Sequence, residues 1–434
     1  MKYAGLDIGT TTISGVLLDV ESGVCLKAIT LANTAHFPEN ESRQAPEKIF
    51  GICQAILTQL SQNYGKPDGL GLTGQMHGIL YIDAQGEAVS PLFSWQDGRG
   101  DLPFKDERSY AAHLSSLTGF AMATGYGLTT HYYNLVNNLV PSEAVSMVTI
   151  PDYVAMRLCG LAEPVLHPSM AHSLGMFDLP TGQFDTGALQ AAGINRELLP
   201  QVDTEDIMVG RTANEVPVAI PIGDNQASFL GSVKPGINVL LNIGTGSQIS
   251  VLSESIQDLP PLETRPYIKS KYLLAGSALC GGSAYNLLHQ FFNQVMGDLG
   301  GMEPQNLYEQ MASLGERVYA TENPLEVDTR FKGTRADPKL RGAIHNLGLE
   351  NFTPGSLVAG FLGGMVAELK SYYDRLPDSL KESELIAGSG NAIRRNVLLR
   401  RIIEDQFRKR LYIPPYEEEA AMGAAIFTAK RMKV

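Results

Sequence analysis

The sequence has few cysteines and few charged residues for its length. Its 434 residues include four scattered cysteines, Cys25, Cys53, Cys159 and Cys280. They form neither a pair with metal-ligand spacing nor a dense framework of the kind found in small disulfide-rich secreted domains. We therefore expect a reducing compartment, the cytoplasm.

The chain also lacks a long apolar run and an excess of basic residues. No run reaches the roughly 20 residues that a membrane-spanning helix needs, and Asp7 interrupts the apolar stretch that a signal peptide would require. Acidic residues outnumber basic ones by 46 to 34, a net charge of −12. This balance argues against nucleic acid as a partner, and we expect no membrane partner either. It does not exclude a nucleotide, because Mg²⁺ neutralises much of a nucleotide's charge.

The length predicts two domains. A chain of 434 residues, 44% of them apolar, is too long for one hydrophobic core and suits two domains of roughly 200 residues each. Gly231 and the segment 234–236 break the pattern between the halves. We place the domains at residues 1–228 and 229–434, and the lack of a low-complexity linker predicts that they pack together.

One sequence motif occurs twice, once in each half of the chain. The segments 7–17 and 242–252 each predict an apolar strand, a Gly-Thr turn and a second strand. Glycine lets the N–H groups of a tight turn converge on an anion, and Thr or Ser hydroxyls add donors. One such turn alone is equally consistent with an ordinary hairpin, but the repetition favours two phosphate-binding turns. Only the first turn follows an acid, Asp7, of the type that holds Mg²⁺.

The predicted elements follow the same order in both halves. In the first half, strands are predicted at 3–8, 12–19, 25–31 and 69–73, with a helix from Pro46 before the last strand. In the second half, strands are predicted at 239–243, 248–252, 272–275 and 385–387, with helices at 283–296, from Ser356, at 392–407 and after 417–419. This order predicts an α/β fold with a mixed sheet in each half. The polar segment 298–343 is predicted to be an irregular insertion.

Other glycine-flanked segments are open to two interpretations. Asp224 follows a predicted strand at 218–222, where it could act as a general base or cap a helix, and spacing alone favours the cap. The junction at 388–390 either presents helix N–H groups to a ligand or only packs. For Gly281 and Gly282, helix packing is the favoured interpretation.

Two polar segments contain residues suited to binding a polyol. Segment 74–78 places a polar pair between glycines, although a turn with a surface histidine fits equally. Segment 94–99 contains Trp95, the only tryptophan, and a lone tryptophan is more often a core residue than a stacking platform. Asp97 and Arg99 are also consistent with a simple surface ion pair.

Taken in order, these motifs resemble the FGGY family of carbohydrate kinases, within the actin-like ATPase superfamily. The two Gly-Thr turns, Gly223 with Asp224, and the 388–390 junction carry the resemblance, which spans nearly the whole chain. Segments 74–78, 94–99, 125–127 and 151–161 are most similar to the subgroup that phosphorylates sedoheptulose. The resemblance implies two ribonuclease-H-like α/β domains around a central cleft. It places the sugar mainly on the N-terminal domain and ATP mainly on the C-terminal one.

The resemblance also implies roles for individual residues. Asp224 matches the catalytic base, and Asp7 matches the acid near Mg²⁺. The positions that match the sugar site are Gln75, Met76, His77, Trp95, Asp97 and Asn225. The positions that match the ATP site are Gly9, Thr10, Thr11, Gly244, Thr245, Gly246, Gly282, Asn286, Gly390 and Asn391. Arg394 lies where relatives place an asparagine near adenine.

The implied activity is ATP- and Mg²⁺-dependent phosphorylation of a primary hydroxyl of a ketose. Sedoheptulose, giving sedoheptulose 7-phosphate, is the best match within the family. Xylulose and ribulose remain alternatives, because pocket depth depends on loops that the sequence does not define. A remote alternative is a non-catalytic nucleotide switch of the actin type. Sugar and ATP are the expected small-molecule partners, and a homodimer is left open.

Overall fold

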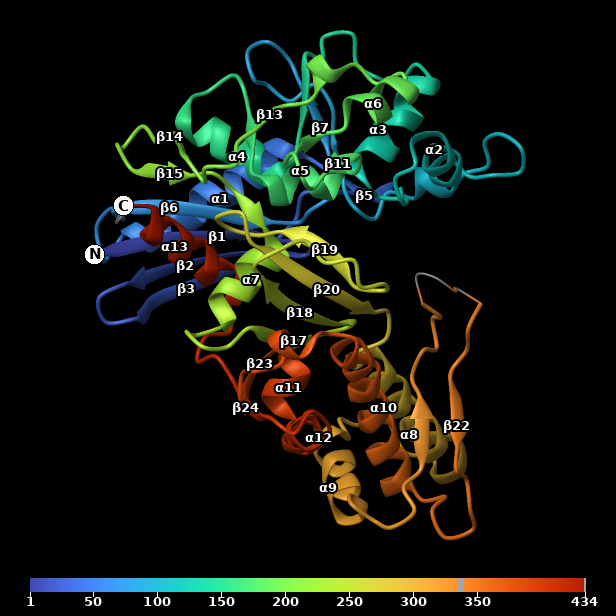
Figure 1. The fold of residues 1–434 in the computed structure, drawn as a ribbon. Helices are drawn as coiled ribbons and strands as arrows, with labels where there is room; N and C mark the ends of the chain where they lie inside the picture. The colour runs from blue at the N-terminus through green and yellow to red at the C-terminus, as the bar shows by residue number, and fades with distance from the viewer. Residues whose placement is uncertain (335–336, 338, 433–434) are drawn as a thin grey trace. The chain divides into compact units, whose positions relative to one another are not determined.

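The computed structural model describes residues 1–334, 337 and 339–432. They form two compact units, which can be followed by colour in Figure 1. The N-terminal unit comprises Met1–Gly231, Arg265–Lys271 and the segment from Glu418, and the C-terminal unit comprises Ser232–Thr264 and Tyr272–Glu417. The units therefore differ from the predicted domains 1–228 and 229–434, because the last helix packs against the first sheet. The assignment of sugar and ATP to the two halves stays a prediction.

A seven-stranded sheet forms the centre of the N-terminal unit. Its strands are β1 (Lys2–Ile8), β2 (Thr12–Asp19), β3 (Val24–Ala32), β6 (Gly69–Gly74), β14 (Met208–Arg211), β15 (Pro217–Ala219) and β16 (Ile222–Gly223). The order is β14-β15-β6-β1-β2-β3, and β16 also pairs with β6. β1, β2 and β3 are antiparallel, whereas β1, β6 and β16 run parallel to one another. The carboxyl ends of β1, β6 and β16 therefore lie at one edge of the sheet.

Helices and short strands complete this unit. The helices are α1 (Pro46–Ser61), η1 (Gly98–Asp101), α2 (Tyr110–Thr118), α3 (Gly127–Val136), α4 (Ile150–Cys159), α5 (Pro168–Leu174), α6 (Thr186–Ala191), η2 (Arg196–Leu198), α7 (Asp224–Ser232) and α13 (Glu419–Met432). The short strands are β4 (His36–Phe37), β5 (Asn40–Gln44), β7 (Leu80–Ile82), β8 (Leu92–Phe93), β9 (Ser146–Val148), β10 (Val165–Leu166), β11 (Phe177–Asp178), β12 (Gln183–Phe184) and β13 (Gln201–Val202).

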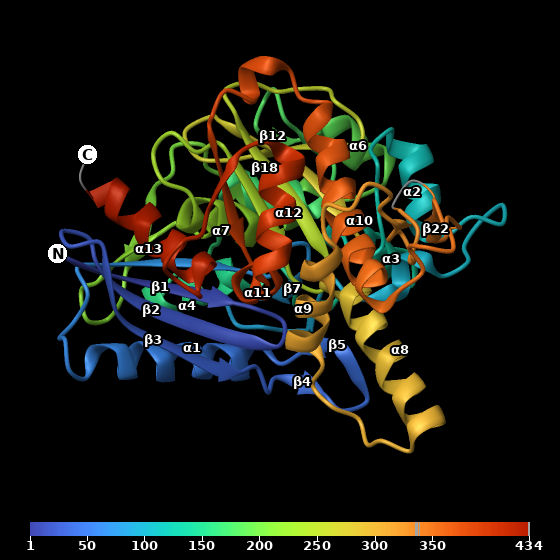
Figure 2. The same cartoon turned by 90° about the horizontal axis from the view of Figure 1, so that it is seen from below.

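The helices α1 and α13 cover opposite faces of the N-terminal sheet (Figure 2). A Cβ atom on Gly15 of β2 would lie 2.3 Å from Ile56 Cγ2 of α1. A Cβ atom on Gly5 of β1 would lie 1.9 Å from the Ala421 carbonyl oxygen of α13. Gly15 pairs with Leu6, the neighbour of Gly5, and side chains alternate between faces along a strand. Glycine on β1 is therefore what lets the α13 backbone lie against the sheet.

A six-stranded sheet forms the centre of the C-terminal unit. Its strands are β17 (Val239–Ile243), β18 (Ser247–Ser253), β19 (Glu263–Pro266), β20 (Tyr272–Ala278), β23 (Leu385–Ser389) and β24 (Arg410–Tyr412). The remaining elements are α8 (Gly282–Gly300), α9 (Tyr308–Val318), β21 (Glu326–Asp328), β22 (Ala343–His345), α10 (Pro354–Asp374), η3 (Asp378–Leu380), α11 (Asn391–Arg395) and α12 (Val397–Phe407). The helix α10 packs against this sheet, with the Tyr372 ring against Gly276 of β20.

The two sheets share one strand order. In the C-terminal unit, β20-β18-β17-β23-β24 repeats the order β3-β2-β1-β6-β15 of the N-terminal unit. In both, the first three strands of this shared order are antiparallel neighbours and the last two add in parallel. The two Gly-Thr motifs consequently occupy the same place in each sheet, which is the turn between its first two strands.

Two local predictions were wrong. The segment 298–343 contains α9 and β21, and Leu307, Met311 and Val327 are buried in the core beside α10. Only one face of α9 is apolar, so the segment as a whole reads as polar. The helix predicted at 392–407 is interrupted at Asn396, which has φ −110° and accepts the Leu399 N–H as the N-cap of α12. Within the described residues, no helix has the length and apolar character needed to cross a membrane.

Candidate active site

Three candidate residues lie at one edge of the N-terminal sheet. Asp7 is the last residue but one of β1, Gln75 follows β6, and Asp224 follows β16. Asp7 and Ile222 both pair with Thr73 of the strand between them. The Thr73 hydroxyl donates a hydrogen bond to the Ile222 carbonyl at 2.7 Å. Parallel pairing thus brings together residues that are far apart in the sequence.

Carboxylates interact at this edge. Burial, followed by the negative charges of Asp224 and Glu418, raises the pKa of Asp7 to about 7. Burial also raises the pKa of Asp224, while the Asn225 backbone N–H and the Arg265 guanidinium act in the opposite direction. Sequence reasoning missed Arg265 and assigned Glu418 only to the start of the last helix. No local motif marks either residue, because each comes from a segment that is distant in the chain.

The Asp224 turn packs closely against the 74–78 segment. Asp224 is the first residue of α7, so it lies at the start of a helix, while its role as a helix cap stays a prediction. A Cβ atom on Gly223 would lie 2.7 Å from the sulfur of the buried Met76. Asn225 is buried, and its Oδ1 accepts a hydrogen bond from Arg265 Nη1 at 3.4 Å. Because Gly223 has no side chain, the predicted sugar-site residue Met76 can pack against the turn that contains the other predicted sugar-site residue, Asn225.

The first Gly-Thr turn is held by its carbonyl groups. The Gly9 carbonyl accepts from Asn33 Nδ2 at 3.0 Å, and the Thr11 carbonyl accepts from the Asn33 backbone N–H at 2.8 Å. The Thr10 carbonyl accepts from His36 Nε2 at 2.8 Å. These bonds hold the turn by its carbonyl groups, on the side opposite its N–H groups. This arrangement suits a turn whose N–H groups bind an anion.

Trp95 lies beside this turn. Its indole N–H donates to the Thr10 hydroxyl at 3.0 Å, and that hydroxyl lies 3.5 Å from Gln75 Oε1. The Gln75 amide donates in turn to Gln44 Oε1 at 2.9 Å. Trp95 is 48% exposed, so the core interpretation is wrong. Gly125 has φ +80°, and a Cβ atom there would lie 2.0 Å from the Trp95 carbonyl oxygen, which explains a glycine in the 125–127 segment.

His77 is held in an uncommon backbone conformation. Its φ is +74°, and its ring stacks on Tyr126 at 4.8 Å between centroids. Its backbone N–H donates to Ser173 Oγ at 3.1 Å, and its Nδ1 donates to the Ser173 carbonyl at 2.7 Å. Gly127 leaves room for the turn, since a Cβ atom there would lie 2.9 Å from the His77 carbonyl oxygen. His77 is therefore a positioned side chain rather than a surface residue of a plain turn.

Asp97 and Arg99 form an ion pair, but not at the surface. Asp97 Oδ1 accepts from Arg99 Nε at 2.7 Å, and Oδ2 accepts from Nη2 at 3.0 Å. The two residues are 4% and 8% exposed. Arg99 also donates to Asn134 Oδ1 and lies over the Phe93 ring. This buried pair anchors the segment beside Trp95 to α3 and β8.

The second Gly-Thr turn is bonded to the start of α8. The Gly282 N–H donates to the Gly244 carbonyl at 2.7 Å. The N–H groups of Gly281 and Ser283 both donate to the Thr245 carbonyl at 3.0 Å. A Cβ atom on Gly281 would lie 2.3 Å from the Gly246 carbonyl oxygen. The packing interpretation of these glycines is therefore correct, and what they pack against is the predicted phosphate turn.

The junction at 388–390 lies beside that turn. β17 and β23 are parallel, with Asn242 opposite Ser389, and Asn242 Nδ2 donates to the Ser389 hydroxyl at 3.0 Å. Gly390 has φ +87°, and a Cβ atom there would lie 2.5 Å from the Ile243 carbonyl oxygen. Asn391, which is exposed, begins α11. The structure thus gathers Gly244, Gly282 and Gly390 in the C-terminal unit.

Two further predicted nucleotide positions have side-chain partners. Asn286 lies one helical turn after Gly282, and its Oδ1 accepts the Tyr308 hydroxyl at 2.9 Å. Arg394 donates to the Pro414 carbonyl at 3.0 Å and to the Tyr416 carbonyl. The Arg394 guanidinium therefore connects α11 to the segment that follows β24.

Comparison with protein families identifies the fold. Residues 2–231 match the N-terminal domain of the FGGY family of carbohydrate kinases, and residues 239–432 match the C-terminal domain. The chain belongs to this family. It is therefore a carbohydrate kinase, as the motifs predicted.

The relatives of this FGGY kinase align with different shares of its length. It is 29% identical to mouse sedoheptulokinase over 98% of its length and 97% of that protein. It is 26% identical to Escherichia coli (strain K12) xylulose kinase over 59% of its length and 56% of that protein. A solved structure of Plasmodium falciparum glycerol kinase with ADP matches with a TM-score of 0.80 and 17% identity, covering 100% of this chain and 90% of that one. With the repeated strand order, the fold class is confirmed as α/β with two ribonuclease-H-like domains.

The Asp7 site of this kinase fits Mg²⁺. Burial, followed by the negative charges of Asp224 and Glu418, raises the pKa of Asp7, and a divalent cation would relieve both the burial of a charge and the repulsion. The described residues contain no group of three or more His, Cys, Asp or Glu side chains arranged to hold a metal ion. Mg²⁺ at kinase sites commonly uses one or two carboxylates, with waters and substrate phosphates as its other ligands. A site built on Asp7 agrees with that pattern.

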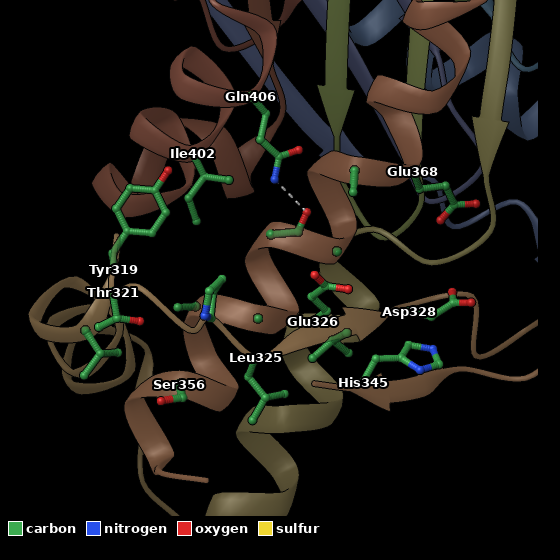
Figure 3. Close-up of a pocket in the computed structure, with 18 of the residues that line it drawn as sticks. Tyr319, Thr321, Leu325, Glu326, Asp328, His345, Ser356, Glu368, Ile402 and Gln406 are labelled. Carbon is green, nitrogen blue, oxygen red and sulfur yellow. Dashed lines mark hydrogen bonds between the residues drawn. The ribbon is translucent and has the colours of Figure 1, made fainter. Parts of the chain in front are cut away.

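The C-terminal unit of the kinase also contains a cavity of about 660 Å³, drawn in Figure 3. It is lined by parts of α9, β21, α10 and α12, between Val318 and Gln406. Gln406 donates to the Gly363 carbonyl at 3.1 Å, the dashed line in Figure 3. Burial raises the pKa of Glu368 at its margin to about 7. The predicted phosphate and adenosine residues of the C-terminal unit belong to other segments and are Gly244, Thr245, Gly246, Gly282, Asn286, Gly390 and Asn391.

Proposed function

We propose that this FGGY kinase transfers the γ-phosphoryl group of ATP to a primary hydroxyl of a ketose, with sedoheptulose as the preferred acceptor and sedoheptulose 7-phosphate as the product. Identity and coverage together support this choice, because a gluconokinase of Bacillus subtilis (strain 168) also aligns over 97% of the chain but at 21% identity. Similarity to mouse sedoheptulokinase extends over 98% of the chain, whereas similarity to the Escherichia coli xylulose kinase extends over 59%. The family does not support the alternative of a non-catalytic nucleotide switch.

In this proposal, Asp224 is the general base. The hydroxyl O–H bond breaks and its proton passes to Asp224, while the hydroxyl oxygen bonds to the γ-phosphorus and the bond to the β-phosphate oxygen breaks. ADP leaves with the electron pair of that bond. The position of Asp224 at the shared strand edge supports the assignment, as does its interaction with Asp7 and Arg265. Carboxylates in other kinases orient the acceptor hydroxyl in the same way.

The sugar would bind to the side of the N-terminal unit where Trp95 and His77 lie. The exposed Trp95 ring supplies an apolar face for a sugar, and His77, fixed through Ser173, supplies a polar group. Gln75, Met76, Asp97 and Asn225 complete the proposed set. The Thr10 hydroxyl donates to Gln75 and accepts from Trp95, and these two bonds support the set because they link the proposed acceptor residues to the proposed phosphate turn.

ATP would bind through the glycine-rich turns. Gly9, Thr10 and Thr11 form the first set, and Gly244, Thr245 and Gly246 form the second. Gly282, Asn286, Gly390 and Asn391 complete the proposed nucleotide residues. Glycine at positions such as Gly282 and Gly390 is required by close backbone contacts, and turns of this kind present N–H donors to phosphate.

Asp7 would hold Mg²⁺. When bound, the ion neutralises negative charge on the transferring phosphoryl group. The chain's own contribution is positioning and electrostatic stabilisation, because phosphoryl transfer asks little covalent chemistry of the protein. We also propose a cytoplasmic location, which the sparse cysteines support, all four being free thiols.

A panel of acceptors tests this function. ADP release is measured with sedoheptulose, xylulose, ribulose, gluconate and glycerol at matched concentrations. We expect kcat/KM for sedoheptulose to exceed the other values by at least about tenfold, the discrimination that a few additional contacts provide. A higher kcat/KM for xylulose or ribulose would overturn the choice of acceptor while retaining the kinase. Phosphorus–proton coupling in the purified product locates the phosphate on the terminal carbon.

A further inference from the structure

Helix α5 presents two buried serines to the two halves of the proposed acceptor site. Ser169 and Ser173 lie one helical turn apart and are 0% and 2% exposed. Ser169 Oγ accepts the backbone N–H of Gly223, the residue before Asp224, at 3.0 Å. Ser173 Oγ accepts the backbone N–H of His77 at 3.1 Å. One short helix thus contacts both the proposed base turn and the proposed sugar turn.

The direction of every hydrogen bond around Ser169 can be assigned. Its backbone N–H donates to His167 Nδ1 at 3.1 Å, so this nitrogen is an acceptor. Ser169 Oγ lies 2.7 Å from the same nitrogen. Because Nδ1 carries no hydrogen, the Ser169 hydroxyl donates to it, while the Ser169 oxygen accepts the Gly223 N–H. His167 Nε2 therefore carries the ring hydrogen and donates to Asp206 Oδ1 at 3.0 Å.

Asp206 fixes the far end of this chain of bonds. Its Oδ2 accepts the Lys269 backbone N–H at 3.3 Å and lies 3.4 Å from Arg431 Nη1 of α13. Asp206 has φ +54°, a conformation that persists when surrounding contacts determine it. His167 and Asp206 are 1% and 3% exposed. A continuous buried network therefore runs from the last helix to the backbone of Gly223.

The order serine, histidine, aspartate is also that of a nucleophilic triad. Here the Ser169 hydroxyl is fully buried and occupied by the Gly223 N–H and His167 Nδ1. A hydroxyl engaged in this way has no approach for an acyl or phosphoryl group. The network holds a backbone in place and does not itself react.

We propose that α5 is a positioning element of the phosphotransfer site, in which Ser169 orients Asp224 through Gly223 and Ser173 orients His77. The inference rests on the proposed roles of Asp224 and His77. It assigns different kinetic consequences to two serines on one helix. Loss of the Ser169 bond misaligns the base and lowers kcat, whereas loss of the Ser173 bond loosens His77 and raises KM for the sugar.

The test compares Ser169→Ala and Ser173→Ala in the full-length enzyme. We expect S169A to lower kcat about tenfold with less than about a twofold change in KM for sedoheptulose, the scale of one lost hydrogen bond. We expect S173A to raise that KM about fivefold or more with a smaller change in kcat, and KM for ATP to change in neither. The matched control is Ser232→Ala, since Ser232 is 1% exposed and its hydroxyl has no partner in the part of the chain that the structure describes.

Several results would overturn the inference. Equal effects of S169A and S173A on kcat and KM, accompanied by a lowered Tm, would show a purely structural role. A kcat for S169A equal to that of S232A would do the same. If S169A does not fold, Asp206→Asn is used, because an amide nitrogen facing the Lys269 N–H and Arg431 weakens the network from a distance; it should lower kcat without changing KM. Asp224→Asn, assayed in parallel, separates the hypotheses: an active D224N rejects the proposed base, whereas an inactive D224N beside a fully active S169A rejects only the positioning role.

Discussion

The indole N–H of Trp95 donates a hydrogen bond to the hydroxyl of Thr10 at 3.0 Å. This bond joins the proposed sugar platform directly to the first Gly-Thr turn. A phosphoryl transfer requires the acceptor hydroxyl and the phosphate to meet at contact distance, so residues that bind each should lie side by side. Because Trp95 leaves 48% of its surface exposed, its ring is also available to a ligand.

Trp95 should report sugar binding without any turnover. It is the only tryptophan in the chain, so intrinsic fluorescence excited at tryptophan wavelengths reports this one position. We expect sedoheptulose alone to shift the emission to shorter wavelength, because a bound sugar replaces water at the exposed ring. A titration gives the dissociation constant directly.

The variant Trp95→Ala tests the same contact kinetically. We expect KM for the sugar to rise roughly three- to tenfold, the worth of an aromatic contact of about 0.5–1.5 kcal/mol, and Trp95→Phe to show a smaller rise. Unchanged emission on saturation with sugar, together with an unchanged KM in W95A, would remove Trp95 from the sugar site.

Asp224→Asn should abolish most turnover while preserving the fold. We expect kcat to fall by at least about 10²-fold, the lower range for loss of a general base, with sugar and ATP binding retained by calorimetry. Asparagine caps a helix as well as aspartate does, so lost capping cannot account for the effect. The control is Asp185→Asn, since Asp185 caps α6 through the Ala188 N–H at 2.7 Å. Near-normal kcat in D224N would reject the assignment.

Asp7→Asn should change the dependence of the rate on Mg²⁺. The variant replaces a charged oxygen ligand by a neutral amide, so we expect the Mg²⁺ concentration for half-maximal rate at fixed ATP to rise roughly tenfold or more. Asp258→Asn serves as a control because Asp258 is an exposed carboxylate. If the Mg²⁺ titrations of D7N and wild type coincide, Asp7 is not the metal acid.

The pH dependence of stability should depend on Asp152 of α4. This carboxyl is 2% exposed, and burial raises its pKa to about 8 despite the hydrogen bond from Thr149. The folded protein therefore keeps a proton that the unfolded chain, with an ordinary carboxyl pKa near 4, has already lost. Its stabilising contribution is complete below about pH 4 and is lost as pH rises to about 8, by as much as about 1.4 kcal/mol per pH unit.

Asp152→Asn provides the comparison, because its side chain is neutral at every pH. We expect the stability of D152N relative to wild type in urea unfolding to increase by about 2–3 kcal/mol between pH 6 and pH 8. Parallel pH profiles for the two proteins would show that Asp152 is ionised in the fold.

Much of the fold follows from local patterns in the sequence. The Gly-Thr turns, the strands on either side of them and the repeated order of elements are all legible, because glycine requirements and apolar spacing act over a few residues. The secondary-structure predictions failed where tertiary packing or a single side-chain cap determines where a helix lies. The apolar stripe of α9 is short and surrounded by polar residues, and a side-chain cap at Asn396 ends one helix and starts another within a pattern that reads as continuous.

The candidate site likewise contains residues that the sequence motifs identified and residues that only the structure revealed. Asp7, Asp224 and the glycines of both turns lie in recognisable motifs. Arg265, Glu418 and Ser169 do not, although the structure places each of them against a motif residue. For Trp95 the sequence favoured a core position, and only its 48% exposure in the structure showed otherwise.

The sequence by itself determined the family, the two Gly-Thr turns and the carboxylates available for chemistry, because these depend on residue type at fixed spacing. The tertiary structure alone decided which distant side chains meet. Parallel pairing of β1, β6 and β16 brings Asp7, Gln75 and Asp224 to one edge, and Gly5 on β1 lets α13 lie against the same sheet. Burial, which no local sequence pattern specifies, raises the pKa of Asp7. Tertiary packing places Ser169 Oγ where it accepts the Gly223 N–H.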